Sequence, residues 1–167
     1  MSSILYTQIH VAISLIGIVT GFIVIFGMIA GRTLPKVTAL FLTTTILTSV
    51  TGFFFPFHGM TPGIVVGILS LVVLLFTLIA LYGKHLAGGW RRTFVITAVL
   101  AQYFNFFVLI VQSFEKVPSL HVLAPTGSEP AFKIAQGVAL VVFVVLGAVA
   151  DRKFRGALIS YTFVGRQ

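Results

Sequence analysis

Apolar residues fill five long stretches of the chain, and short polar segments separate them. Each stretch has the length of about 20 residues that an α-helix needs to cross the hydrocarbon core of a bilayer. No Asp, Glu, Lys or Arg lies at the centre of any stretch. The pattern therefore predicts an all-α fold, a polytopic transmembrane helical bundle with five spans. The predicted spans are about 9–30, 37–57, 61–82, 93–114 and 131–150.

The composition identifies lipid as the solvent of this chain. Hydrophobic residues make up 58% of it and charged residues 8%, whereas a soluble domain carries about 25% charged residues. We therefore expect residues 1–167 to form a single integral membrane domain, with an outer loop at 115–130 and a cytoplasmic tail at 151–167. The first residues lack the basic segment of a cleaved signal peptide, so the first span is expected to be retained.

Positive charges between the stretches predict the orientation. Lys and Arg cluster after the first, third and fifth stretches: Arg32 and Lys36, then Lys84, Arg91 and Arg92, then Arg152, Lys153 and Arg155. The connection after the second stretch has neither residue type, and Glu115 and Glu129 balance the lysines that follow the fourth. Because basic loops stay in the cytoplasm, we predict an outer N-terminus and a cytoplasmic C-terminus. The net charge of +8 is thus explained by topology, and nucleic-acid binding, which needs one basic face, is excluded.

Small residues and helix-start signals predict how the spans begin and meet. Gly17 and Gly21 are four residues apart and form a face on which a second helix can approach closely. The sequence Ser128-Glu129-Pro130 is typical of a helix start, with a capping hydroxyl, an acidic group and a proline in the first turn.

Three of the four histidines fall on the outer side of this topology. They are His10, His58 and His121, whereas His85 is cytoplasmic. Neutral imidazole binds transition metals and haem iron, and with no cysteine in the chain a metal must use nitrogen and oxygen ligands. We predict metal ligands at His10, His58, His121, Glu115 and Glu129, and a cofactor site, for b-type haem or a quinone, at the three histidines with Gln112 and Gln136.

Two other interpretations of the histidines follow from the same topology. Each histidine is equally explained as an interfacial residue in contact with water, because the three come from distant segments without metal-ligand spacing. A transmembrane relay of two bis-histidine haems is excluded, since only His85 lies on the inner side. A single outer haem held by His10 and His58 is compatible with the sequence.

The fourth stretch contains a polar seam of three amide side chains, Gln102, Asn105 and Gln112. Their spacing of three and seven residues places them on one face of a helix. Amides at membrane depth usually bond to neighbouring helices, and Thr44, Thr48 and Thr51 of the second stretch are the natural partners. The functional alternative is a seam that holds a quinone head group, a small solute or a file of water. Amides do not ionise, and the lack of an intramembrane carboxylate or lysine argues against a proton-coupled pump.

Three segments resemble an uncharacterised family of small bacterial five-span inner-membrane proteins. They are Gln8-Ile9-His10, the run from Thr51 to Gly59, and Leu123-Ala124-Pro125-Thr126 with Ser128-Glu129-Pro130. The resemblance implies a location in the bacterial inner membrane as a multi-pass protein. It implies no activity.

Three functional hypotheses remain open. The first is a redox or metal-handling protein with the outer histidine and carboxylate site. The second is an accessory or scaffolding subunit of a larger membrane complex. The third is a small channel or carrier, a homo-oligomer lined by the seam of the fourth span. The chain has no nucleotide-binding or nucleophile-elbow motif, so no catalytic residue is assigned and whether it is an enzyme stays open.

Overall fold

The computed structural model describes residues 3–55 and 62–154, and that part of the chain is helical without any strand. Its elements are α1 (Ser3–Ile29), α2 (Pro35–Gly52), α3 (Pro62–Leu78), the π-helix η1 (Ile79–Gly83), α4 (Trp90–Lys116), the short α5 (Pro118–His121) and α6 (Pro130–Lys153). The prediction of an all-α fold is thereby confirmed.

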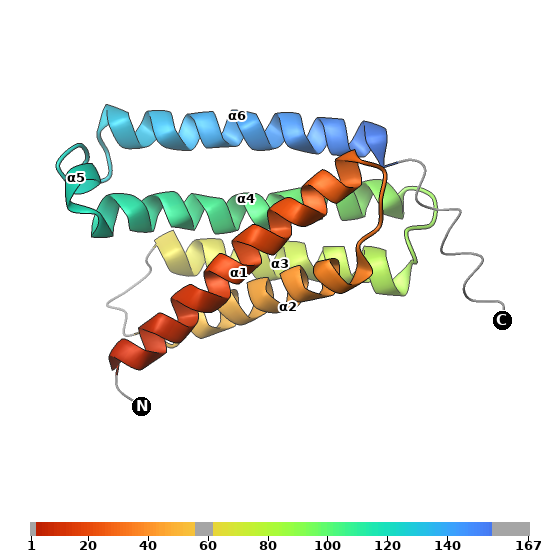
Figure 1. The fold of residues 1–167 in the computed structure, drawn as a ribbon, viewed down its shortest axis with the longest axis horizontal. Coiled ribbons are helices and arrows are strands. Elements are labelled where there is room, and N and C mark those ends of the chain that lie inside the picture. The colour runs from red at the N-terminus through yellow and green to blue at the C-terminus, as the bar shows by residue number, and fades with distance from the viewer. Residues whose placement is uncertain (1–2, 56–61, 155–167) are drawn as a thin grey trace.

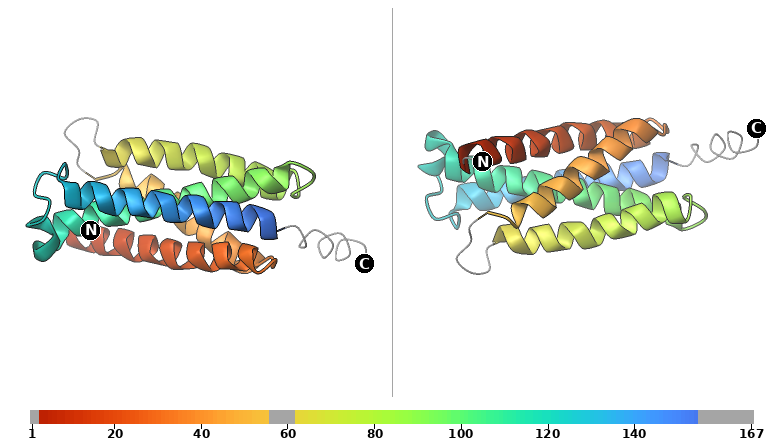
Figure 2. Two further views of the ribbon diagram at one scale, coloured as in Figure 1. Left: turned by 90° about the horizontal axis from the view of Figure 1, so that it is seen from above. Right: turned by 90° about the horizontal axis from the view of Figure 1, so that it is seen from below.

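The five long helices run side by side along the length of the molecule (Figures 1 and 2). α4 is central and contacts α1, α3 and α6, while α2 packs between α1 and α3. α1 begins at the end that also carries α5, and α6 ends at the opposite end (Figure 1). We call these the His10 end and the Asp151 end of the bundle.

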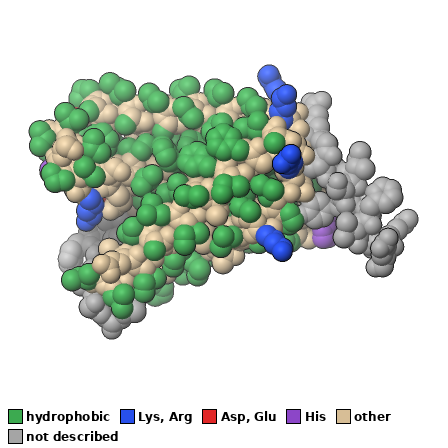
Figure 3. Space-filling model, viewed as in Figure 1, with side chains coloured by type: hydrophobic (Ala, Val, Ile, Leu, Met, Phe, Trp, Pro, Cys, Tyr) green, Lys and Arg blue, Asp and Glu red, His purple; other side chains and the backbone are tan. Residues whose placement is uncertain are grey.

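Within residues 3–55 and 62–154, four helices are long and apolar enough to cross a membrane. They are Ile4–Ile29, Gly63–Gly83, Trp90–Lys116 and Pro130–Lys153. Hydrophobic side chains cover the flank of the bundle, and Lys and Arg side chains lie toward its two ends (Figure 3). Both observations identify a membrane protein.

α2 is the exception among the long helices. Its 18 residues include six threonines and one serine, which lower its hydropathy below that of the other four. It also ends at Gly52, so residues 53–55 of the predicted span are not helical. The reason is Pro56 in the sequence, because the residue before a proline avoids the helical conformation.

Glycines allow the close approach of α1 to its neighbours, as their spacing predicted. A Cβ on Gly17 would lie 3.2 Å from Oγ1 of Thr44 in α2. A Cβ on Gly21 would collide with the side chain of Gln102 in α4. The small-residue face of α1 is therefore used against two helices at once.

Candidate functional site

The imidazole of His10 lies at the contact between α1 and the last turn of α2. Its Nδ1 is 2.8 Å from Oγ1 of Thr51. The ring of Phe55 meets it edge-on at 5.0 Å between centroids, and Tyr6 donates its hydroxyl to the Thr51 carbonyl at 2.6 Å. His10 is thus half-buried in a small aromatic cluster with Tyr6 of α1 and Phe55 of the segment after α2.

The hydrogen bonds of Thr51 favour one tautomer of His10. The Thr51 hydroxyl donates its one proton to the carbonyl of Leu47 at 2.6 Å. A hydroxyl engaged in this way accepts from His10, which favours the neutral imidazole with its proton on Nδ1 and its lone pair on Nε2. This is the arrangement in which histidines bind metals, with one nitrogen oriented by a partner and the other free to coordinate.

The structure does not bring the other predicted ligands to His10. Nδ1 of His121 faces the carbonyl of Phe114 at 3.3 Å, and Glu115 accepts a hydrogen bond from Gln112 at 3.1 Å. No group of three His, Asp or Glu residues that could hold a metal occurs within 3–55 and 62–154. His58 lies outside the described residues, so its part in a site stays a prediction.

Glu129 stabilises the turn before α6. Its carboxylate accepts hydrogen bonds from the backbone N–H of Thr126 at 3.1 Å, from the Thr126 hydroxyl at 2.8 Å and from the N–H of Ser128 at 3.0 Å. Partial burial raises the pKa of Glu129, but these hydrogen bonds outweigh it, and the pKa lies below its ordinary value. The carboxylate of Glu129 thus forms these hydrogen bonds within its own loop.

The start of α6 differs from the predicted cap in one respect. Pro130 occupies the first turn as expected, but the helix receives no side-chain cap. The Ser128 hydroxyl instead bonds to that of Thr126 at 2.6 Å, because the turn closes on itself around Glu129.

The polar seam of α4 divides into two parts. Gln102 is fully buried and donates Nε2 to the carbonyl of Ile18 in α1 at 2.8 Å, and Asn105 donates to Oγ1 of Thr45 in α2 at 3.0 Å. Gln112 is exposed, and among the described residues it bonds to Glu115 of its own helix. The two inner amides therefore connect helices, whereas Gln112 faces the surface.

Two buried amide oxygens lack a partner among the described residues, Oε1 of Gln102 and Oε1 of Gln136. Gln136 donates its Nε2 to the carbonyl of Phe107 at 3.2 Å and so joins α6 to α4. It lies on a different helix pair from the His10 cluster. The structure thus gives Gln136 a contact that joins two helices, and its place beside the histidines stays a prediction.

Asp151 organises the opposite end of the bundle, and the hydropathy analysis did not single it out. Its carboxylate pairs with Arg91 at 3.1 Å and with Arg92 at 3.3 Å, and Arg91 also donates to the Asp151 carbonyl at 3.0 Å. The signal in the sequence is that Asp151 is the only aspartate and directly follows the last apolar stretch.

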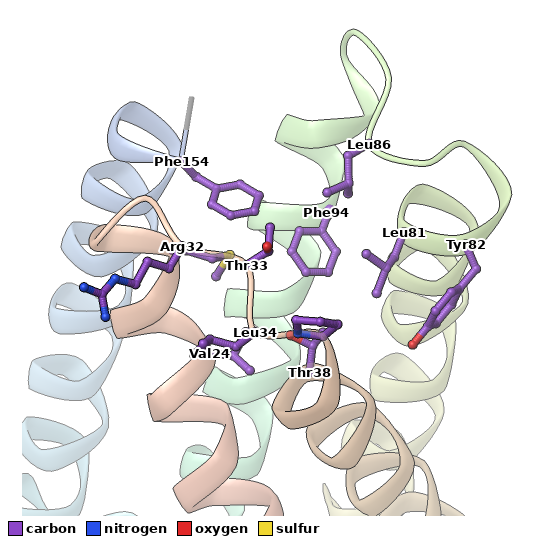
Figure 4. A pocket seen from close by; sticks show the side chains of 12 residues that line it. Val24, Arg32, Thr33, Leu34, Thr38, Leu81, Tyr82, Leu86, Phe94 and Phe154 are labelled. Atoms are coloured by element: carbon purple, nitrogen blue, oxygen red, sulfur yellow. The ribbon is translucent and has the colours of Figure 1, made fainter. Parts of the chain in front are cut away.

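A cavity of about 80 Å³ lies at the Asp151 end, between Phe94, Phe154, Leu81 and the loop after α1 (Figure 4). Its volume is far below the roughly 300 Å³ of small-molecule sites. The guanidinium of Arg32 points away from the rings that line the cavity (Figure 4). The cavity is therefore a packing gap next to Leu86.

Leu86 reaches this gap through an unusual backbone. Leu86 is buried although it lies in the loop after η1, and both His85 (φ 47°) and Leu86 (φ 58°) are left-handed. Such a conformation costs about 1–3 kcal/mol per non-glycine residue, and burial of the leucine side chain offsets it.

Comparisons with protein-family models, curated proteins and solved structures found no match to this chain.

Proposed function

We propose that the protein is a multi-pass protein of the bacterial inner membrane that crosses the bilayer five times. The N-terminus and the His10 end face outward, and the Asp151 end faces the cytoplasm. The alternation of basic segments supports this orientation, and four apolar helices support membrane embedding.

α2 serves as the fifth span in this proposal. Its 18 residues extend about 27 Å, close to the hydrocarbon thickness of about 30 Å. Several of its hydroxyls donate to carbonyls of the same helix, as Thr44 does to Leu40 at 2.8 Å and Ser49 to Thr45 at 3.0 Å. Polar groups satisfied in this way are compatible with lipid.

We further propose that the outer end binds a transition metal or a b-type haem through Nε2 of His10. The observation that carries this is the hydrogen bond between Nδ1 and Thr51, which orients the ring and favours the tautomer whose lone pair is on Nε2. The second imidazole in the proposal is His58, which follows Phe55 by three residues, a separation of at most about 11 Å along the chain. The chemistry proposed is redox or metal handling on the outer side.

The test is a binding titration of the purified full chain with zinc, copper and haemin, followed by metal analysis and absorption spectra. Wild type is expected to bind about one equivalent of one of these. His10→Gln should abolish binding, and Thr51→Val should weaken it about tenfold, as loss of a partner that orients a metal-binding histidine does. His85→Gln, at the other end of the bundle, is the matched control and should bind as wild type.

Two results would overturn the proposal. The first is wild type that takes up neither metal nor haemin. The second is binding that survives His10→Gln.

A further inference from the structure

A groove of about 240 Å³ runs between α4 and α6 on the flank of the bundle. It is lined by Ile96, Leu100 and Tyr103 on α4 and by Leu140, Val144 and Gly147 on α6. Gly147 lines the groove without a side chain, and a Cβ there would lie 3.4 Å from Val99, in ordinary van der Waals contact. The lining is apolar, so the groove suits a hydrocarbon chain.

The groove has a basic end. Arg92 precedes Ile96 by one helical turn, and Arg152 follows Ala148, another lining residue, by one turn, so each lies on the same face of its helix as the groove. Both Arg91 and Arg92 pair with Asp151, but Arg91 has only 15% of its side chain exposed, whereas Arg92 has 69% exposed and can reach a phosphate at the surface. Arg91, Arg92, Arg152 and Lys153 outnumber the single carboxylate of Asp151, so this end attracts anions.

The distance from the basic end to the far end of the groove matches one leaflet of a bilayer. The lining on α4 runs from Ile96 to Tyr103, a rise of about 10 Å, and Arg92 lies one turn before it, about 16 Å from Tyr103 at 1.5 Å per residue. Half of a hydrocarbon core is about 15 Å, so a phosphate at the basic end would place an acyl chain along the groove.

We propose that this groove is a binding site for an anionic phospholipid of the inner leaflet, with its phosphate at Arg92 and Arg152 and one acyl chain between α4 and α6. The proposal rests on the membrane orientation proposed above. It is independent of the ligand at His10, which lies at the other end of the molecule (Figure 1).

The test is native mass spectrometry of the detergent-purified full chain with phosphatidylglycerol and, separately, zwitterionic phosphatidylcholine of the same chain length. Wild type should bind phosphatidylglycerol preferentially. Gly147→Leu fills the groove and should lower this affinity about tenfold, equivalent to about two buried methylenes. Arg92→Gln should lower it about fivefold, the effect of one basic residue near an anionic headgroup.

Two controls match these variants. Gly137→Leu lies on the same helix at a position with open space around it, and Lys36→Gln removes a charge at the same end of the bundle; both should bind as wild type. Ala148→Leu, an exposed position in the groove, replaces Gly147→Leu if that variant folds poorly. Equal binding of both lipids, or equal losses in Gly137→Leu and Gly147→Leu, would overturn the proposal.

The outcomes also separate this proposal from the one above. Carbonate extraction of membranes measures membrane insertion, and labelling of introduced cysteines measures orientation. If the protein is inserted and oriented as proposed but shows no lipid preference, only the proposal of the lipid site is overturned.

Discussion

The amide of Gln102 in α4 donates a hydrogen bond to the backbone carbonyl of Ile18 in α1 at 2.8 Å. Gly21, which follows Ile18 by three residues on α1, leaves the space that this side chain occupies. A fully buried glutamine is thus accommodated by the absence of a side chain on the facing helix. The contact joins α1 to the central helix α4.

Gly21→Ala should destabilise the protein because its methyl group would collide with Gln102 and Phe41. We expect a loss of about 1–3 kcal/mol, typical of an overpacked core, measured by thermal unfolding in detergent. Gly137→Ala, in open space on α6, should melt like wild type or slightly higher. Equal melting of the two variants would show that Gln102 moves aside freely.

Substitutions of Gln102 should separate its packing from its hydrogen bond. Gln102→Leu removes the donor together with the unpartnered Oε1, so the change in unfolding free energy should stay within about 1 kcal/mol. Gln102→Ala leaves a cavity and should cost about 2–5 kcal/mol. Thermal unfolding of both variants measures the difference, and a Leu variant as unstable as the Ala variant would contradict it.

Asp151→Asn should loosen the Asp151 end by breaking the ion pairs with Arg91 and Arg92. We expect a loss of about 1–2 kcal/mol, between the values for exposed and buried pairs. A double-mutant cycle with Arg91→Gln measures the coupling by thermal unfolding. A coupling near zero would mean that the backbone hydrogen bond from Arg91 is the larger contribution.

The loop before α6 should lose order in acid. Because the folded-state pKa of Glu129 lies below its ordinary value, its stabilising effect is full above the ordinary value of about 4.3 and is lost as the pH falls through the lowered pKa. Hydrogen exchange of the segment 117–130, corrected for intrinsic rates, should show faster exchange in Glu129→Gln than in wild type at pH 7. The difference should vanish in acid, and a difference independent of pH would contradict the assignment.

Single cysteines should report the orientation without background, because the chain has no cysteine. Ser119→Cys, exposed in α5, should react with an impermeant maleimide in spheroplasts. Ala87→Cys, exposed in the loop before α4, should react only after lysis. The reverse pattern would invert the proposed topology.

Hydropathy alone determined the helical class and the approximate place of each long helix. The side chains of an apolar run must be buried in protein or face lipid along the whole run, so the extent of the run can be counted along the chain. The pairing of Gln102 and Asn105 with other helices also follows from one sequence, since buried amides need partners. The same counting places the end of α2 too late, because Pro56 acts on the conformation of its neighbour and leaves the hydropathy of the run unchanged.

Only the tertiary structure decided which groups meet. The start of α1, the end of α4, α5 and the start of α6 lie at the same end of the bundle (Figure 1), and the predicted ligands His10, Glu115, His121 and Glu129 belong to these segments or directly precede them. Yet Glu115 and Glu129 bond within their own helix or loop, and His121 bonds to the backbone of α4. The partners of His10 and Asp151 lie 41 and 60 residues away in the sequence. Such distances depend on how closely the helices approach and how they are rotated, and hydropathy measured along one chain contains neither quantity.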